Sequence, residues 1–105
     1  MAQLSNRRTE LDELLRRTSG LTNVYFQPPA SIRMQYPCIV YERSAANTKF
    51  ADNGPYRYKK RYKVTVIDRD PDSEIPNKIA MLPMCVFDRH YKADDLNHDV
   101  FNIYY

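Results

Sequence analysis

From Tyr56 to Ile67 the chain alternates between two kinds of side chain for twelve residues, which is the period of a β-strand. One face of this strand carries Tyr56, Tyr58, Lys60, Tyr62, Val64 and Val66, and the other carries Arg57, Lys59, Arg61, Lys63 and Thr65. The pattern therefore predicts one long strand with an aromatic and apolar face and a basic face.

The other patterns predict two helices and four further strands. Residues 4–18 align Leu4, Leu11, Leu14, Leu15 and Thr18 in one helical stripe, and Gly20 follows at a C-cap position. Strands are expected at 22–26, 38–43, 84–91 and 98–105, with a short helix between Asp72 or Ser73, its N-cap, and Pro83. The order helix, three strands, helix, two strands predicts a single α+β domain over residues 1–105, with a mostly antiparallel or mixed five-stranded sheet.

The core is expected where the apolar faces of these elements meet. Leu11, Leu14 and Leu15 of the helix should pack on the sheet, whose inward side chains are Ile39, Val64, Val66, Phe87, Phe101 and Ile103. Two connections are polar: residues 44–55 are expected to form a long loop and residues 92–97 a shorter link. Phe50 is isolated in the longer one, where it could fill a pocket on a neighbouring subunit or fold back on its own core.

Charge is distributed unevenly along the chain. The net charge is +3, but residues 33–63 hold eight Lys or Arg against two acids, and residues 64–105 hold four against eight. The basic segment can track a phosphate backbone, or it can protect an exposed strand from unwanted pairing. It can also meet the acidic segment of a neighbouring copy, a heterologous contact that closes into a ring or continues as a filament.

Enzymatic chemistry has little support in the sequence. The only two glycines, Gly20 and Gly54, lie 34 positions apart, which excludes glycine-rich phosphate loops. Cys38 and Cys85 match no zinc spacing and are expected to be reduced thiols, and the acids from Asp68 to Glu74 lack the glycine and the final glutamate of a calcium loop. We therefore expect no enzyme, no metal, no cofactor and, since the longest apolar stretch has eight residues, no membrane span.

Three segments together, 36–44, 50–79 and 82–105, resemble the small tail-terminator, or tail-completion, proteins of long-tailed phages. The resemblance is carried by a Tyr-Pro before a strand, by the segment 51–56 (ADNGPY), by a strand that ends in 66–72 (VIDRDPD), by 87–91 (FDRHY) and by 96–105 (LNHDVFNIYY). The N-terminal helix matches only in its position and amphipathic pattern.

This resemblance implies a structural protein of the virion without catalytic residues. Such proteins assemble in the host cytoplasm as a hexameric ring on the tail tube, end tube polymerisation and present a surface to the head-side connector or head-closure protein, with DNA able to pass through the lumen. Two alternatives stay open: a neck or head-closure adaptor, and a small basic nucleic-acid-binding module that uses Arg57, Lys59, Arg61 and Lys63.

The candidate subunit interface combines the polar loop, the basic strand face and the acidic segments. Ring closure is expected to pair opposite charges, with 57–63 of one subunit facing 68–74 or 94–95 of the next. The candidate residues are Phe50, Asp52, Asn53, Arg57, Lys59, Arg61, Lys63, Asp68, Asp70, Asp72, Asp94 and Asp95.

Overall fold

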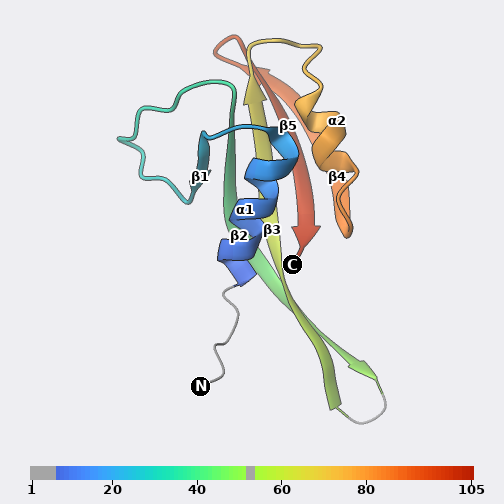
Figure 1. The fold of residues 1–105 in the computed structure, drawn as a ribbon. Coiled ribbons are helices and arrows are strands. Elements are labelled where there is room, and N and C mark those ends of the chain that lie inside the picture. The colour runs from blue at the N-terminus through green and yellow to red at the C-terminus, as the bar shows by residue number, and fades with distance from the viewer. Residues whose placement is uncertain (1–6, 52–53) are drawn as a thin grey trace.

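The structure is a computed structural model that describes residues 7–51 and 54–105, with backbone only at residues 45–51 and 54–59. It is an α+β domain with two helices and a five-stranded sheet, in the expected element order (Figure 1). The elements are α1 (Arg7–Ser19), β1 (Val24–Phe26), β2 (Cys38–Ala51), β3 (Gly54–Asp68), α2 (Ile75–Ala80), β4 (Cys85–Ala93) and β5 (Leu96–Tyr104).

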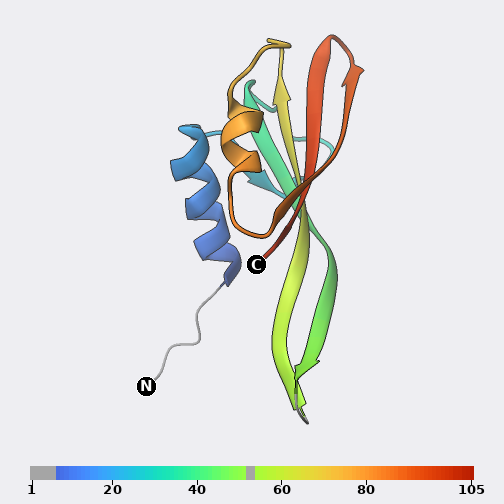
Figure 2. The same cartoon turned by 90° about the vertical axis from the view of Figure 1, so that its right-hand side faces the viewer.

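The sheet is mixed, which is one of the two forms that the sequence predicted. Its strand order is β1-β2-β3-β5-β4, and β1 runs parallel to β2 while all the other neighbours are antiparallel. Both helices lie on the same face of the sheet, which we call the helix face (Figure 2). The pair is parallel because the segment 27–37 carries the chain back to the end of the sheet where β1 starts, so that Val24 lies opposite Ile39.

The main core lies between α1, α2 and the helix face. Leu11 and Leu15 are fully buried there, and Leu14 is partly buried at its margin. The alternation of the long strand has its predicted effect, because it directs Tyr62, Val64 and Val66 into this core. The other buried members are Val24, Ile39, Tyr41, Ile79, Phe101 and Ile103.

Phe87 is the exception to the predicted core. Its ring packs against Phe101 with centroids 5.5 Å apart, but 52% of the residue stays exposed. The reason is topological, since β4 is an edge strand with a neighbouring strand on one side only.

The expected loop at 44–55 is wrong, because these residues continue the sheet. β2 runs to Ala51 and β3 starts at Gly54, and their pairing extends from Cys38 opposite Ile67 to Ala51 opposite Gly54. Small and polar residues such as 44–48 give no strand signal alone, but pairing with the alternating strand supplies backbone hydrogen bonds. The outer part of this hairpin projects beyond the rest of the molecule (Figure 1).

Two smaller expectations also need correction. The link 92–97 is a tight hairpin in which only Asp94 and Asp95 separate β4 from β5, with φ of 53° and 61°. Aspartate tolerates this left-handed region better than most residues, because its short side chain can form hydrogen bonds locally. The N-cap of α2 is Glu74 and not Asp72 or Ser73, and it makes no side-chain cap hydrogen bond.

Both cysteines are free thiols, as the sequence predicted. Cys38 is fully buried on the face opposite the helices, and burial, followed by the charge of Asp68, raises its pKa from 9.0 to about 11. Burial likewise raises the pKa of the Cys85 thiol to about 11.

Helix docking should dominate stability, because Leu15 is fully buried between α1 and the sheet. We expect Leu15→Ala to lower the free energy of unfolding by about 2–5 kcal/mol, measured by urea denaturation. Leu14→Ala is the matched control, and its loss should be smaller, roughly 1 kcal/mol, because that side chain is only partly buried. Equal losses would contradict the packing described here.

Stability should also fall in alkali. In the unfolded chain the thiols ionise near pH 9, whereas the folded state holds their protons up to about pH 11. The stabilisation is therefore complete below pH 9 and is lost as the pH rises from 9 towards 11. The free energy of unfolding of Cys38→Ala, followed between pH 8 and 11, should decline less steeply than that of the wild type; identical slopes would contradict this account.

Candidate functional site

The acidic candidates come together at one end of the sheet. Asp68 ends β3, and the β4–β5 turn lies beside it because Asp68 pairs with Asn97. The Asn97 amide nitrogen donates to the carbonyl oxygens of Asp68 and Arg69, each at 3.3 Å. The turn after β3 and the turn at Asp94–Asp95 therefore form one acidic end of the domain (Figure 1).

The two acidic turns differ in how their carboxylates are used. Asp68 Oδ1 accepts from the Asp70 amide at 3.0 Å, and Asp70 Oδ1 accepts from the Asp72 amide at 2.9 Å. These bonds shape the turn before α2. Asp94 and Asp95 are exposed at a hairpin tip, and their carboxylates make no hydrogen bond or ion pair with any residue that the structure describes.

The basic candidates lie toward the opposite end, on the β2–β3 hairpin. Arg57 pairs with Lys49 and Lys59 with Asn47 in the backbone register, and Phe50 lies in β2 opposite Pro55. The side chains of Phe50, Arg57 and Lys59 are outside the described part of the structure. Asp52 and Asn53 are outside the described residues altogether, so these candidates stay predictions.

Arg61 and Lys63 lie where the hairpin joins the body of the sheet. The Arg61 Nε donates to the Ser44 hydroxyl at 3.1 Å, and that hydroxyl donates to the Arg61 carbonyl oxygen at 3.1 Å. Lys63 stands directly opposite Glu42 on β2. Both side chains are half-buried, so this part of the predicted basic row has local partners.

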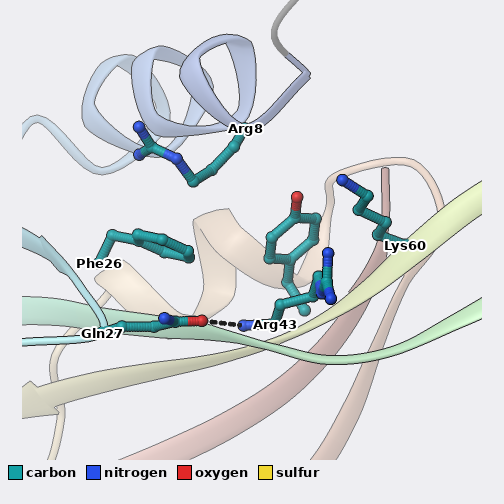
Figure 3. Close-up of a pocket in the computed structure, with 6 residues that line it drawn as sticks. Arg8, Phe26, Gln27, Arg43 and Lys60 are labelled. Carbon is teal, nitrogen blue, oxygen red and sulfur yellow. Dashed lines mark hydrogen bonds between the residues drawn. The ribbon is translucent and has the colours of Figure 1, made fainter.

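A different set of basic residues surrounds a pocket on the helix face, where the hairpin leaves the body of the domain (Figure 3). The cavity has a volume of about 440 Å³. Its lining residues come from α1, the end of β1, β2 and β3, and they are Arg8, Phe26, Gln27, Arg43, Lys60 and Tyr62.

The pocket is positioned by the start of α1. The Arg8 guanidinium lies 4.5 Å from the centre of the Phe26 ring, a cation–π contact, and its Nη1 donates to the Tyr41 hydroxyl at 3.2 Å. Beside it, Arg7 lies 4.4 Å from the ring centre of Tyr105. These contacts fix the helix start to the sheet and to the chain end.

A partly buried polar network supports the wall of the pocket. The Tyr41 hydroxyl donates to Asp12 Oδ2 at 2.7 Å, and Asp12 also pairs with Arg16. Arg16 donates in turn to the carbonyl oxygens of Thr22 and Val24, at 2.6 Å and 3.1 Å. Burial and the bond to Asp12 raise the pKa of Tyr41, so the phenol stays protonated and keeps donating.

The pocket has an excess of positive charge. Arg8, Arg43 and Lys60 contribute three cations, and among the described residues no carboxylate forms an ion pair with any of them. Gln27 adds a polar amide whose Oε1 accepts from the Arg43 backbone at 3.3 Å. The arrangement suits an anion bound beside the cationic groups of these residues.

The sequence did not identify these three cations as one site. Lys60 was recognisable in the sequence, since it is the single charge on the aromatic face of its strand. Arg43 reaches the same face because it pairs with Tyr62. Arg8 was recognisable as well, since a cation near the start of a helix opposes the helix dipole. The sequence does not show that the helix and the hairpin meet, and this contact is what forms the pocket.

In comparisons with known proteins, no protein-family model and no curated protein matches the chain. Over the described residues, neither helix is long and apolar enough to cross a membrane.

The Tyr41 hydroxyl should contribute measurably to stability, because its loss leaves Asp12 and Arg8 without a shared partner. We expect Tyr41→Phe to lower the free energy of unfolding by about 0.5–1.5 kcal/mol in urea melts. In the control Tyr25→Phe the lost bond, from the Gln35 amide, is exposed, so the change should be smaller. A neutral Tyr41→Phe would show that the network carries no net stability.

Proposed function

We propose that this chain is a structural protein of a phage virion, the subunit of a ring that caps the tail tube. In this role it ends tube polymerisation and presents a surface to the head-side connector or head-closure protein. The proposal rests on the sequence resemblance over residues 36–105 and on one structural observation, the separation of opposite charges to the two ends of the domain.

This separation follows the direction of β3. Lys60 lies at the basic pocket and Asp68 at the acidic end, eight residues later, which corresponds to about 26 Å along a strand. Two surfaces of opposite charge on one chain support a head-to-tail contact between copies. Contacts of this heterologous kind close into rings or continue as filaments.

The free edge of the sheet supports assembly as well. β4 is an edge strand, and Val86, Phe87 and Tyr91 along it are 60%, 52% and 42% exposed. An edge strand with exposed apolar side chains is a ready surface for another chain, and isolated soluble domains usually protect such an edge.

The basic hairpin also fits a second candidate function, a nucleic-acid-binding module. Cations repeat along β3 from Arg57 to Lys63, and such a row can neutralise successive phosphates. A capping ring encloses a lumen through which DNA passes, so a DNA contact there is compatible with the first proposal. A neck or head-closure adaptor differs from it only in the ring that it joins.

The decisive experiment adds purified protein to polymerising tail tubes and measures tube lengths by negative-stain microscopy. We expect rings at tube ends and a halt in growth. A truncated variant, in which Asn-Gly replaces residues 47–59 between the paired Ala46 and Lys60, should lose most capping, at least tenfold. Its melting temperature should stay close to that of the wild type, because the core lies outside the deleted segment.

The matched control keeps the hairpin length and removes charge, as Arg57→Gln with Lys59→Gln. If this variant caps normally while the truncated one fails, the hairpin acts through its shape. If purified protein leaves tube growth unchanged but binds duplex DNA with an affinity that falls steeply with salt, the nucleic-acid-binding module replaces the terminator.

A further inference from the structure

The pocket on the helix face collects more positive charge than its own surroundings balance. Arg8, Arg43 and Lys60 come from three different elements and line one cavity, with Arg8 over Phe26 and the other two on its other side (Figure 3). Among the described residues, no acid forms an ion pair with any of the three. Mutual repulsion between these cations falls when an anion enters, so the cavity is suited to an anionic group.

The shape of the cavity narrows the choice of ligand. The Arg8 guanidinium already covers the Phe26 ring. Arg43 and Lys60, on the side toward the hairpin, are therefore the cations that a ligand can contact. A volume of about 440 Å³ suits a small ligand or the tip of a polypeptide turn. Guanidinium and ammonium groups bind carboxylates and phosphates alike, so the source of the anion needs a separate argument.

The same chain presents a segment of the required kind. The β4–β5 turn carries two adjacent carboxylates, Asp94 and Asp95, at an exposed tip held rigid by strand pairing on both sides. The neighbouring acidic turn is less suitable, because Asp68 and Asp70 already use carboxylate oxygens to accept backbone amides. A rigid tip loses little conformational freedom on binding.

The turn and the pocket of one chain cannot meet, since β3 runs from Lys60 at the pocket to Asp68, which pairs with Asn97 beside the turn. We propose that the pocket formed by Arg8, Arg43 and Lys60 binds the Asp94–Asp95 turn of a second copy. A pair of copies joined in this way still has one free pocket at one end and one free turn at the other. Further copies can therefore add at both ends by the same contact. The inference rests on the self-assembly in the proposed function and names the two surfaces that would meet.

A charge-exchange experiment tests the contact directly. The pocket variant carries Arg43→Glu and Lys60→Glu, and the turn variant carries Asp94→Asn and Asp95→Lys. Both turn positions are left-handed, which asparagine tolerates better than lysine, so a melting curve must show that the turn variant stays folded. We expect each variant alone to self-associate at least tenfold more weakly than the wild type in sedimentation velocity. An equimolar mixture should recover association, because every turn then faces a pocket of opposite charge.

The matched control makes the same change of charge at the neighbouring turn, as Asp70→Asn with Asp72→Lys, and should associate within about threefold of the wild type. If this control weakens association as strongly as the turn variant does, association depends on overall charge and not on the Asp94–Asp95 turn, and the inference fails. It fails equally if the mixture does not recover while both variants melt as the wild type does. Carbodiimide coupling of mixed ¹⁵N- and ¹⁴N-labelled protein should join Lys60 of one copy to Asp94 or Asp95 of another.

Other outcomes separate this inference from the proposed function. Protein that caps tubes but stays monomeric at millimolar concentration overturns the inference and leaves the capping role intact. Protein that associates through turn and pocket yet leaves tube growth unchanged supports the inference and contradicts the capping role. If the pocket variant loses binding to a short DNA duplex and self-associates normally, the pocket takes phosphates and the inference is wrong.

Discussion

The antiparallel pairing of β2 with β3 is the constraint on which the rest of the structure depends. Its inner half, from Cys38 opposite Ile67 to Arg43 opposite Tyr62, lies beneath the helices and carries the centre of the core. Its outer half has no other described strand beside it, since the β3–β5 pairing ends at Arg61 opposite Tyr104. One ladder therefore acts both as the middle of a packed domain and as a projecting arm, and the irregularity between Arg43 and Ala45 marks the change.

The attachment of α1 depends on charge as well as on leucines. A buried tyrosine needs a partner for its hydroxyl, and Asp12 provides one for Tyr41 while Arg16 balances the carboxylate and reaches the carbonyls around β1. The same hydroxyl accepts from Arg8, so the packing of the helix also fixes one cation of the pocket. Stability and site geometry are coupled here, because the wall of the pocket is the docked helix itself.

The sequence predicted the elements that have a strong period and missed those defined by their partners. The leucines of α1 and the alternation that places Tyr62, Val64 and Val66 on one face are local patterns, and the structure uses both as expected. Residues 44–51 have no such pattern and become a strand only because β3 lies alongside, and the Asp94–Asp95 turn lacks the glycine that usually announces a tight hairpin. The pocket joins residues 8, 43 and 60, which no spacing relates, so only the tertiary structure could reveal it.

Screening decides where the separated charges can act. In physiological salt the electrostatic interaction between exposed charges decays over a Debye length of about 8 Å. The pocket and Asp68 are separated by about 26 Å along β3, roughly three Debye lengths, so the acidic end cannot relieve the repulsion among the cations of its own chain. Within the chain, Asp12 reaches Arg8 through the Tyr41 hydroxyl, whereas Arg43 and Lys60 have no ion pair with a described acid. The contact that we propose would place the carboxylates of a second copy beside these two cations, and added salt should weaken it.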